Sequence, residues 1–579
     1  MNRYLLLLLC LLGFRQMSHA QNMTWKQHAK TAEELLQERK YKDAAEQYEM
    51  AWRRKTDKLE YLMQSGEAYL IVRDFRKAAE VFRIVRDRTS TYPMAGFRYG
   101  QCLKQQGKYK EALVAFRKFK GEYGGVDKAA MEERVKKEIE GCELAKAMKA
   151  QANQSGLKLE HLSANVNTLE AEFAPIPFSE DILYFSSTMA GKANIYRSQR
   201  KAGQWTRATV PQGLPKIDGE HFCNGAFAPD LSRFYFTICK SNPVWGDLST
   251  QCEIHVILRK DNEWSQPIRL PDYVNETGKT TTHPHVVFQE GKEIVYFSSN
   301  REGGKGGMDI WYMERELDSE GVDFSFPANA GMDINTPLDE VTPFYSTDDG
   351  MLFFSSNGKV NIGGFDIYKA SGNKAFWEKP QILAYPVNSS ADDYFYRTKP
   401  NSLDGFFVSN RTYGMEKITT TQEDIFAFYQ PVAKAFVSGV IQDKLSKKPL
   451  DGVQVSLYEL IDDEHLRLLE AKVAANGQYE FGLIPNRRFR VEARKAGYET
   501  NRYEFETDAL ESLKEFGQLL LLQKMAIRRS GGTPPIIKES NQKTIAGRNK
   551  RPASPETKTA IITPPPVQPN TRISEGEVS

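Results

Sequence analysis

The sequence predicts a multidomain chain in which helical repeats come first, followed by a β-propeller and a small β-sandwich. Three observations predict this order: a helical period of 34 residues, a period of 56 to 59 residues that carries strand pairs, and a final run of short alternating strands. The 579 residues allow several domains. The net charge of +3 provides no global field that would attract nucleic acid. The predicted domains are 25–152, 158–430 and 433–523, with an export segment at 1–20 and a tail at 526–579.

The first twenty residues read as a secretory signal. Arg3 gives a positive start, an apolar run covers 5–12, and Ser18 and Ala20 are the small residues of a cleavage site. The apolar run is too short to span a bilayer, and no other stretch reaches the roughly 20 apolar residues that a span needs. Lipid attachment at Cys10 is the disfavoured alternative, because this cysteine lies within the leucine run. We therefore expect an exported protein that has no transmembrane helix once mature.

The helical repeats are marked by alanines 34 residues apart: Ala44, Ala78 and Ala112. Each alanine has an aromatic residue three positions before it, another four positions after it, and a small residue twelve positions before it. The aromatic residues are Tyr41, Tyr48, Phe75, Phe82, Tyr109 and Phe116, and the small residues are Ala32, Gly66 and Gly100. This pattern predicts a tetratricopeptide solenoid, with 128–149 as a capping helix. The expected use is a concave groove for a partner; a spacer or a dimer contact is the alternative.

The propeller is predicted from a repeated sequence unit. In this unit one strand ends in aromatic residues and Ser-Ser-Asn, a loop follows, and the next strand begins with an acidic residue and isoleucine. Its central residues are Ile195, Ile254, Ile310, Ile367 and Ile425. Five blades are therefore visible, with room for a sixth in degenerate sequence. In four copies the first strand is marked by a dipeptide that ends in proline: Ala174-Pro175, Ala228-Pro229, His283-Pro284 and Thr342-Pro343.

Five cysteines remain after export: Cys102, Cys142, Cys223, Cys239 and Cys252. Cys239 and Cys252 flank one loop on two antiparallel strands of the second copy, so they are the main disulfide candidates. Cys102 and Cys142 are a less favoured pair, with two buried thiols as the alternative. Cys223 is then left over, and its state stays open.

No catalytic motif is present, because the chain has no Gly-x-Ser-x-Gly, His-Glu-x-x-His, Walker or Cys-x-x-Cys sequence. His283 and His285 resemble a metal pair, but no carboxylate cluster accompanies them, so we interpret them as strand histidines. Asp309, Asp366 and Asp424 are expected to bond the backbone of the preceding loop. The prediction is accordingly no catalytic residue, no metal, no cofactor and no enzyme activity.

The last domain is predicted from alternating strands such as 453–457 and 489–493, with Asn476-Gly477 as a hairpin turn. It resembles the carboxypeptidase regulatory-like domain, a transthyretin-like sandwich, without a zinc ligand set. The tail contains Pro564-Pro565-Pro566 and is rich in Ser, Thr and basic residues, so we expect it to be disordered.

The propeller elements resemble the TolB-type, WD-like repeats of bacterial envelope proteins. The domain order as a whole resembles the PorE-like proteins of the type IX secretion system, but a tail replaces their OmpA-like domain. The resemblance implies a non-catalytic periplasmic scaffold associated with the outer membrane and with secretion or gliding machinery. The implied partners are envelope or secretion-machine proteins, with peptidoglycan as a further candidate and without nucleic acid.

Two alternatives stay open. The first is a glycan- or peptidoglycan-binding protein that uses the propeller face and the sandwich. The second is a hydrolase in the propeller funnel, which would bring His221, His283 or His285 together with carboxylates.

Overall fold

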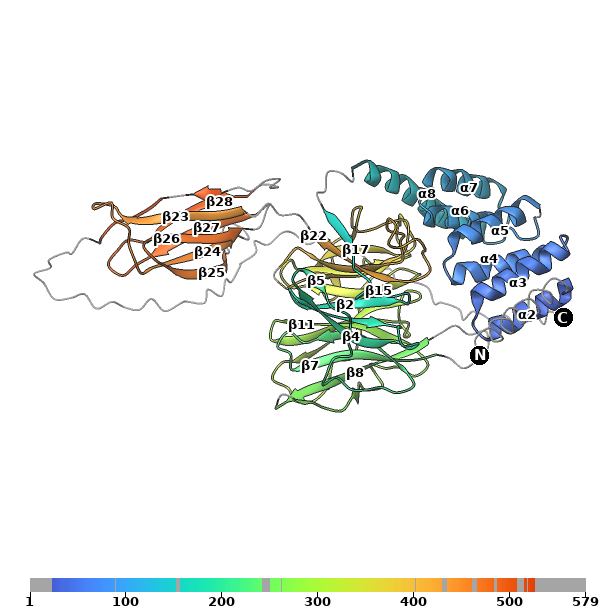
Figure 1. Ribbon diagram of the computed structural model, residues 1–579, viewed down its shortest axis with the longest axis horizontal. Helices are drawn as coiled ribbons and strands as arrows, with labels where there is room; N and C mark the ends of the chain where they lie inside the picture. The colour runs from blue at the N-terminus through green and yellow to red at the C-terminus, as the bar shows by residue number, and fades with distance from the viewer. Residues whose placement is uncertain are drawn as a thin grey trace, which may run out of the picture. The chain divides into compact units, whose positions relative to one another are not determined.

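The computed structural model describes residues 23–525, apart from positions 89, 262, 401 and 518 and the segments 152–156, 242–249, 430–434, 461–465, 484–486 and 508–514. The predicted export segment and the predicted tail lie outside the described residues. The chain forms two compact units, divided between Ala433 and Lys434. The first contains the helices and most of the strands, and the second contains strands β23 to β30 (Figure 1). None of the helices in the described part is long and apolar enough to cross a membrane.

The described residues contain seven helices, which follow one another as antiparallel neighbours. They are α2 (Trp25–Gln37), α3 (Tyr41–Arg54), α4 (Leu59–Ile71), α5 (Phe75–Arg88), α6 (Ala95–Gln105), α7 (Tyr109–Glu122) and α8 (Lys128–Gln151). A Cβ atom on Gly66 would come within 2.7 Å of the Phe82 ring, and one on Gly100 within 2.7 Å of the Phe116 ring. Glycine is therefore needed where these helices approach most closely.

The prediction of a tetratricopeptide solenoid is wrong. The chain has only seven helices against thirty strands in its described residues, and these helices belong to the same compact unit as the propeller. In a solenoid each repeat contacts only its neighbours. Here Ile362, from a propeller loop, is buried in one apolar cluster with Phe116, Val135 and Cys142. Helices α7 and α8 thus pack against the propeller through Ile362.

The propeller prediction is confirmed, because five sheets are arranged as successive blades. The first has β2 (Glu172–Ser179), β3 (Ile182–Ser187), β4 (Asn194–Lys201) and β5 (Gln204–Trp205). The second has β6 (His221–Phe227), β7 (Arg233–Ser241), β8 (Thr250–Lys260), β9 (Glu263–Trp264) and β10 (Ile268–Arg269). The third has β11 (Thr281–Gln289), β12 (Lys292–Ser299), β13 (Asp309–Glu316) and β14 (Ala328–Asn329).

The fourth blade has β15 (Glu340–Ser346), β16 (Met351–Ser356), β17 (Asp366–Asn373), β18 (Phe376–Trp377) and β19 (Gln381–Ile382). The fifth has β20 (Asp393–Thr398), β21 (Gly405–Ser409) and β22 (Asp424–Tyr429), and its outer strand is β1 (Lys158–His161). The first strand of the propeller therefore closes the last blade, with His161 opposite Phe426. The described residues contain no sixth blade.

The inner strand of every blade carries a β-bulge. Its first residue has a positive φ in each case: Ala174, Asn224, His283, Thr342 and Phe395. Proline follows at three of these positions, where a break in the ladder makes its missing N–H harmless. In the second blade the bulge is Asn224-Gly225, so the predicted equivalence of Ala228-Pro229 is wrong.

A buried asparagine side chain fixes the third strand in four of the five blades. Asn335 Oδ1 accepts a hydrogen bond from Ile310 N at 2.8 Å, and Asn335 Nδ2 donates to Ile310 O at 2.9 Å. The same pair of bonds joins Asn167 to Ile425, Asn275 to Ile254 and Asn388 to Ile367. The repeated isoleucine of the sequence pattern is thus held by an asparagine from the next connecting loop.

The second unit contains two four-stranded sheets. One has β23 (Ala435–Asp443), β26 (Gln478–Leu483), β29 (Glu515–Gly517) and β30 (Leu520–Leu522), and the other has β24 (Val453–Leu460), β25 (Leu466–Ala474), β27 (Arg488–Arg494) and β28 (Asn501–Glu506). The predicted turn at Asn476-Gly477 is formed: both residues have a positive φ, and Gln478 N donates to Ala475 O at 3.0 Å across an antiparallel bridge. The flanking strands pair in different sheets, so this turn carries the chain from one sheet to the other.

Candidate functional site

The structure joins Cys239 to Cys252 by a disulfide, and the two residues face each other directly on β7 and β8. Cys102 and Cys142 are separate buried thiols, so their predicted alternative pairing is not formed. They belong to different apolar clusters, one centred on α5 and one on α7 and α8. Cys223 is a third buried thiol, and burial raises its pKa to about 12.

Removing the disulfide by the double change Cys239→Ser and Cys252→Ser should destabilise the second blade. The bond spans 13 positions, and closing a loop of this size contributes about 3 kcal/mol in the chain-entropy model. Urea unfolding of the variant against the oxidised parent would measure this loss. Dithiothreitol should lower the stability of the parent and leave that of the variant unchanged. An equal effect of dithiothreitol on both proteins would contradict the disulfide between Cys239 and Cys252.

The histidines considered for a hydrolase site do not gather with carboxylates. His283 and His285 lie at the propeller centre, where burial and Arg397 lower the pKa of each to about 3. His285 Nε2 lies 3.1 Å from Tyr345 O, and His221 Nδ1 accepts from Ala193 N at 3.1 Å. The centre is filled by the bulge residues, with Phe395 against His283. No group of three metal-ligating side chains occurs in the described part of the chain.

The half-buried His283 predicts a loss of stability in mild acid. Its folded pKa of about 3 lies below the unfolded value of 6.5, so between these values the unfolded chain binds a proton that the folded chain does not. Stability therefore falls as pH drops through 6.5. From pH 7 to pH 5 the parent should lose on the order of 2 kcal/mol more than His283→Asn, which tolerates the positive φ. Urea unfolding at both pH values tests this, and equal losses would refute it.

The three repeated aspartates divide into two groups. Asp309 Oδ2 accepts from Lys305 N at 2.5 Å, and Asp366 Oδ2 accepts from Ile362 N at 2.5 Å, as expected for loop-holding residues. Asp424 instead contacts His161 Nε2 at 2.9 Å and Lys417 Nζ at 2.7 Å. All three are committed to structure, so the chemistry of a site must come from elsewhere.

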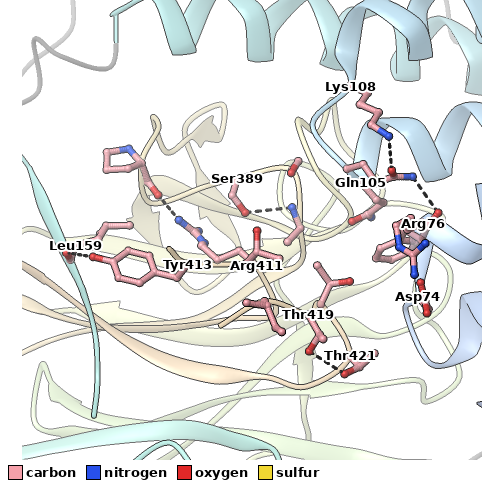
Figure 2. Close-up of a pocket in the computed structure, with 18 of the residues that line it drawn as sticks. Asp74, Arg76, Gln105, Lys108, Leu159, Ser389, Arg411, Tyr413, Thr419 and Thr421 are labelled. Carbon is pink, nitrogen blue, oxygen red and sulfur yellow. Dashed lines mark hydrogen bonds between the residues drawn. The ribbon is translucent and has the colours of Figure 1, made fainter. Parts of the chain in front are cut away.

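A cleft of about 770 Å³ lies between the helices and the propeller loops that face them. Figure 2 shows Asp74, Arg76 and Lys108 of the helical part on one side and Arg411, Tyr413 and Thr419 of the propeller on the other. Two propeller loops, 385–391 and 411–421, form the floor and one wall. The volume is within the usual range for small-molecule sites.

The loops of this cleft are fixed by an arginine from the α4–α5 turn. Arg73 Nη1 contacts Glu423 Oε1 at 2.5 Å, its Nη2 donates to Tyr394 OH at 3.0 Å, and its Nε lies 3.4 Å from Asp392 Oδ2. The hydroxyl of Thr420 donates to Arg73 O at 2.7 Å. The loop 411–421 is therefore tied to the α4–α5 turn through Thr420, and Arg73 is held beside it by two carboxylates and a tyrosine hydroxyl.

The lining combines hydroxyls, amides and tyrosine rings. Ser389, Gln106 and Tyr413 are already engaged: Ser389 Oγ contacts Asp393, Gln106 Nε2 donates to Phe75 O, and Tyr413 OH donates to Leu159 O. In contrast, the hydroxyls of Tyr385 and Thr412 make no side-chain hydrogen bond within the described residues. These two groups are open to a ligand that offers hydroxyls or oxygens.

Cations dominate the ionisable residues of the lining. The cations are Lys42, Arg76, Lys108, Lys149, Lys158 and Arg411, and the single carboxylate is Asp74. Sequence reasoning missed all of these residues, although one signal was present. Lys42 and Arg76 occupy the same position in the 34-residue period, two residues before the marker alanine. The propeller side of the cleft comes from irregular loops, for which the sequence pattern holds no signal.

Solved structures similar to this chain are propeller proteins, found at low identity. Zg3597, a family 117 glycoside hydrolase of Zobellia galactanivorans, is 10% identical, with 47% of this chain and 89% of that one covered and a TM-score of 0.32. An endo-arabinase of Bacteroides thetaiotaomicron is 15% identical, with 46% and 95% covered and a TM-score of 0.29. An α-L-arabinofuranosidase of Podospora anserina is 13% identical, with 47% and 94% covered and a TM-score of 0.31. No protein-family model and no curated protein matches the chain.

These findings correct three predictions. The similar structures are named as enzymes, which contradicts both the non-catalytic secretion-machine scaffold and the absence of enzyme activity. The tetratricopeptide solenoid is the third, since the helices pack against the propeller within one compact unit. At these identities and TM-scores the likeness does not reveal what this chain binds.

Proposed function

We propose that this protein binds a glycan in the cleft between the helices and the propeller. The observation that carries the proposal is the lining of the cleft, in which the open hydroxyls of Tyr385 and Thr412 lie among further hydroxyls, amides and tyrosine rings. Sugars present hydroxyl groups at their edges and C–H groups on their faces. Hydrogen-bonding side chains and aromatic rings suit these two kinds of surface respectively.

The lining supports binding more directly than hydrolysis. Glycoside hydrolysis ordinarily uses two carboxyl groups on opposite sides of the scissile bond. Among the described residues of the cleft only Asp74 carries a carboxylate, and one of its oxygens accepts from Lys77 N at 3.1 Å. The described lining of the cleft therefore offers the groups that hold a sugar chain.

The change Tyr385→Phe tests the proposal with little disturbance, since it removes one hydroxyl and keeps the ring. Loss of one hydrogen bond corresponds to about 0.5–1.5 kcal/mol, or roughly a 2- to 12-fold weaker affinity. Titration calorimetry against a panel of soluble polysaccharides would measure it. Tyr312→Phe is the matched control, because Tyr312 lies on β13 outside the cleft.

Two results would contradict the proposal. The first is that no polysaccharide of the panel binds, or that Tyr385→Phe and Tyr312→Phe bind with the parent's affinity. The second is release of reducing sugars by the purified protein, which would replace a binding role with hydrolysis.

The expected location accompanies this proposal. The signal pattern at 1–20 predicts export, and the resemblance to PorE-like envelope proteins predicts the periplasm and association with the outer membrane. In that compartment the glycans within reach are those of the cell envelope, peptidoglycan included. Fractionation of cells that express the full chain would test this: recovery in the cytoplasm would refute the location and leave the cleft proposal to its own test.

A further inference from the structure

We infer that the glycan held by the cleft is an anionic one, with several negatively charged groups along its chain. This inference rests on the proposed function and adds the charge of the ligand. It depends on four lysines from separate parts of the fold, Lys42 at the start of α3, Lys108 in the α6–α7 turn, Lys149 near the end of α8 and Lys158 on β1.

None of these four lysines has an acidic partner. All four are exposed, and none forms an ion pair within the described residues. Lys108 Nζ donates to the neutral Gln106 Oε1 at 2.8 Å, and Lys149 Nζ lies 5.0 Å from the centre of the Tyr109 ring. Most ionised lysines elsewhere on a protein surface are interspersed with acids. Here their charges stay unbalanced around one concavity.

The other two cations of the lining are already balanced. Arg76 Nη1 pairs with Glu80 at 3.2 Å, and Arg411 pairs with Asp393 at 2.5 Å, beneath the cleft floor. The four lysines are therefore the charges that are available to a ligand. They lie on helix, turn and strand, so no single local sequence feature places them together.

The local charge is large compared with that of the whole chain. Six cations and one carboxylate line the cleft, a formal charge of +5, whereas the chain of 579 residues carries +3. The remainder of the chain is thus formally −2. A concave surface with one sign of charge concentrates the field and attracts counter-charged ligands. This asymmetry favours an anion over a neutral sugar.

The residue type also indicates how the anion is recognised. Lysine acts as a flexible point charge, whereas arginine holds a single carboxylate or phosphate with a planar fork. Four separated ammonium groups match a chain that carries repeated charges better than one compact anion. The shared chemistry is an anionic group on the sugar, either a carboxylate or a sulfate, and the experiment separates the two.

The test uses the purified full chain and three probes: polygalacturonate, its fully methyl-esterified and therefore uncharged form, and dextran sulfate. Each is titrated at 50 and 200 mM NaCl. The expected result is at least 10-fold tighter binding of polygalacturonate than of its ester, with a clear loss of affinity at the higher salt. Dextran sulfate that binds as tightly would show that any anionic group is accepted, and weaker binding would identify the carboxylate.

Two quadruple variants distinguish the effect of the four cleft lysines from the effect of the protein's total charge. The first carries K42Q, K108Q, K149Q and K158Q, and should bind polygalacturonate at least 10-fold more weakly than the parent. The control carries K201Q, K216Q, K260Q and K305Q, which remove the same charge from exposed lysines outside the cleft lining. It should bind within 2-fold of the parent. Unchanged melting temperatures would show that both variants are folded.

The outcomes distinguish this inference from the proposed function. Equal binding of polygalacturonate and its ester, with both weakened by Tyr385→Phe, would overturn the anionic ligand and keep glycan binding in the cleft. Equal losses in the two quadruple variants would overturn the role of the four lysines. If no probe binds and the wider panel fails as well, both proposals are refuted.

Discussion

Replacing Gly141 with leucine should cost about 4 kcal/mol of folding free energy and abolish glycan binding. Glycine within a helix is ordinarily unfavourable by about 1 kcal/mol relative to alanine, so its presence in the middle of α8 needs a reason. A Cβ atom at this position would collide with the carbonyl oxygen of Asn361 in a propeller loop. That loop cannot yield easily, because Asn361 Nδ2 donates to Ser356 O at 2.8 Å and to Gly364 O at 2.9 Å.

Gly121→Leu is the matched control for this prediction. Gly121 is also helical, near the end of α7, and a Cβ atom there would meet nothing within 4 Å. The control should be neutral or more stable by up to about 1 kcal/mol. Urea unfolding and polysaccharide titration of both variants provide the measurement. If Gly141→Leu unfolds like Gly121→Leu and binds like the parent, α8 is not seated on the propeller as described.

Asn335→Ala should destabilise the propeller by about 3–5 kcal/mol. The side chain is 3% exposed, and its removal leaves Ile310 N without a partner. Ile310 O and Asn329 Oδ1 each lose one hydrogen bond and keep one, from Ala330 N and Gly331 N. A buried polar group left unpaired costs about 1–3 kcal/mol and each further lost hydrogen bond about 0.5–1.5 kcal/mol, so the sum exceeds the effect of an ordinary substitution. Urea unfolding followed by tryptophan fluorescence would measure the loss.

Asn335→Asp is the informative comparison, because it keeps the shape and the acceptor and removes the two donated bonds. It should lose at least as much stability as the alanine variant at pH 7, because the new carboxylate oxygen is buried against Ile310 O and Asn329 Oδ1. The equivalent change Asn388→Ala, in the next loop of the same kind, should cost about as much as Asn335→Ala. An effect near zero at both positions would show that the third strands do not depend on these side chains.

The propeller could be predicted from the sequence because each blade buries the same type of residue at the same position. Ile310 and Ile367 are each fully buried in the third strand of a blade, so the same residue type returns at each copy. The asparagine that holds them was overlooked, although Val or Ile precedes Asn at 166–167, 274–275, 334–335 and 387–388. A second period is therefore present in the connecting loops.

The helical period led to the wrong prediction of a solenoid because it reports only the contacts between neighbouring helices. Gly66 and Gly100 show that the predicted close approaches between helices are real, but helix-to-helix spacing says nothing of what covers the remaining faces. Ile362 and Asn361 lie more than two hundred residues from α8 in sequence, and their contacts decide that the helices join the propeller. The local pattern was visible, and the long-range partner was not.

The cleft could not be predicted because it is assembled from separate segments. Lys42 and Lys158 are exposed residues on a helix and a strand, and Tyr385 and Thr412 occupy irregular loops. Exposed polar residues are common on any surface, and only the tertiary fold distinguishes these from the rest.

A hydrogen-exchange footprint tests the central claim most directly. The full chain would be labelled in deuterated buffer with and without saturating polygalacturonate, and the difference located by peptide. We expect protection in 385–391 and 411–421 and in the helical turn 105–108, which line the cleft. Protection confined to the propeller centre, the outer blade turns or the second unit would contradict it.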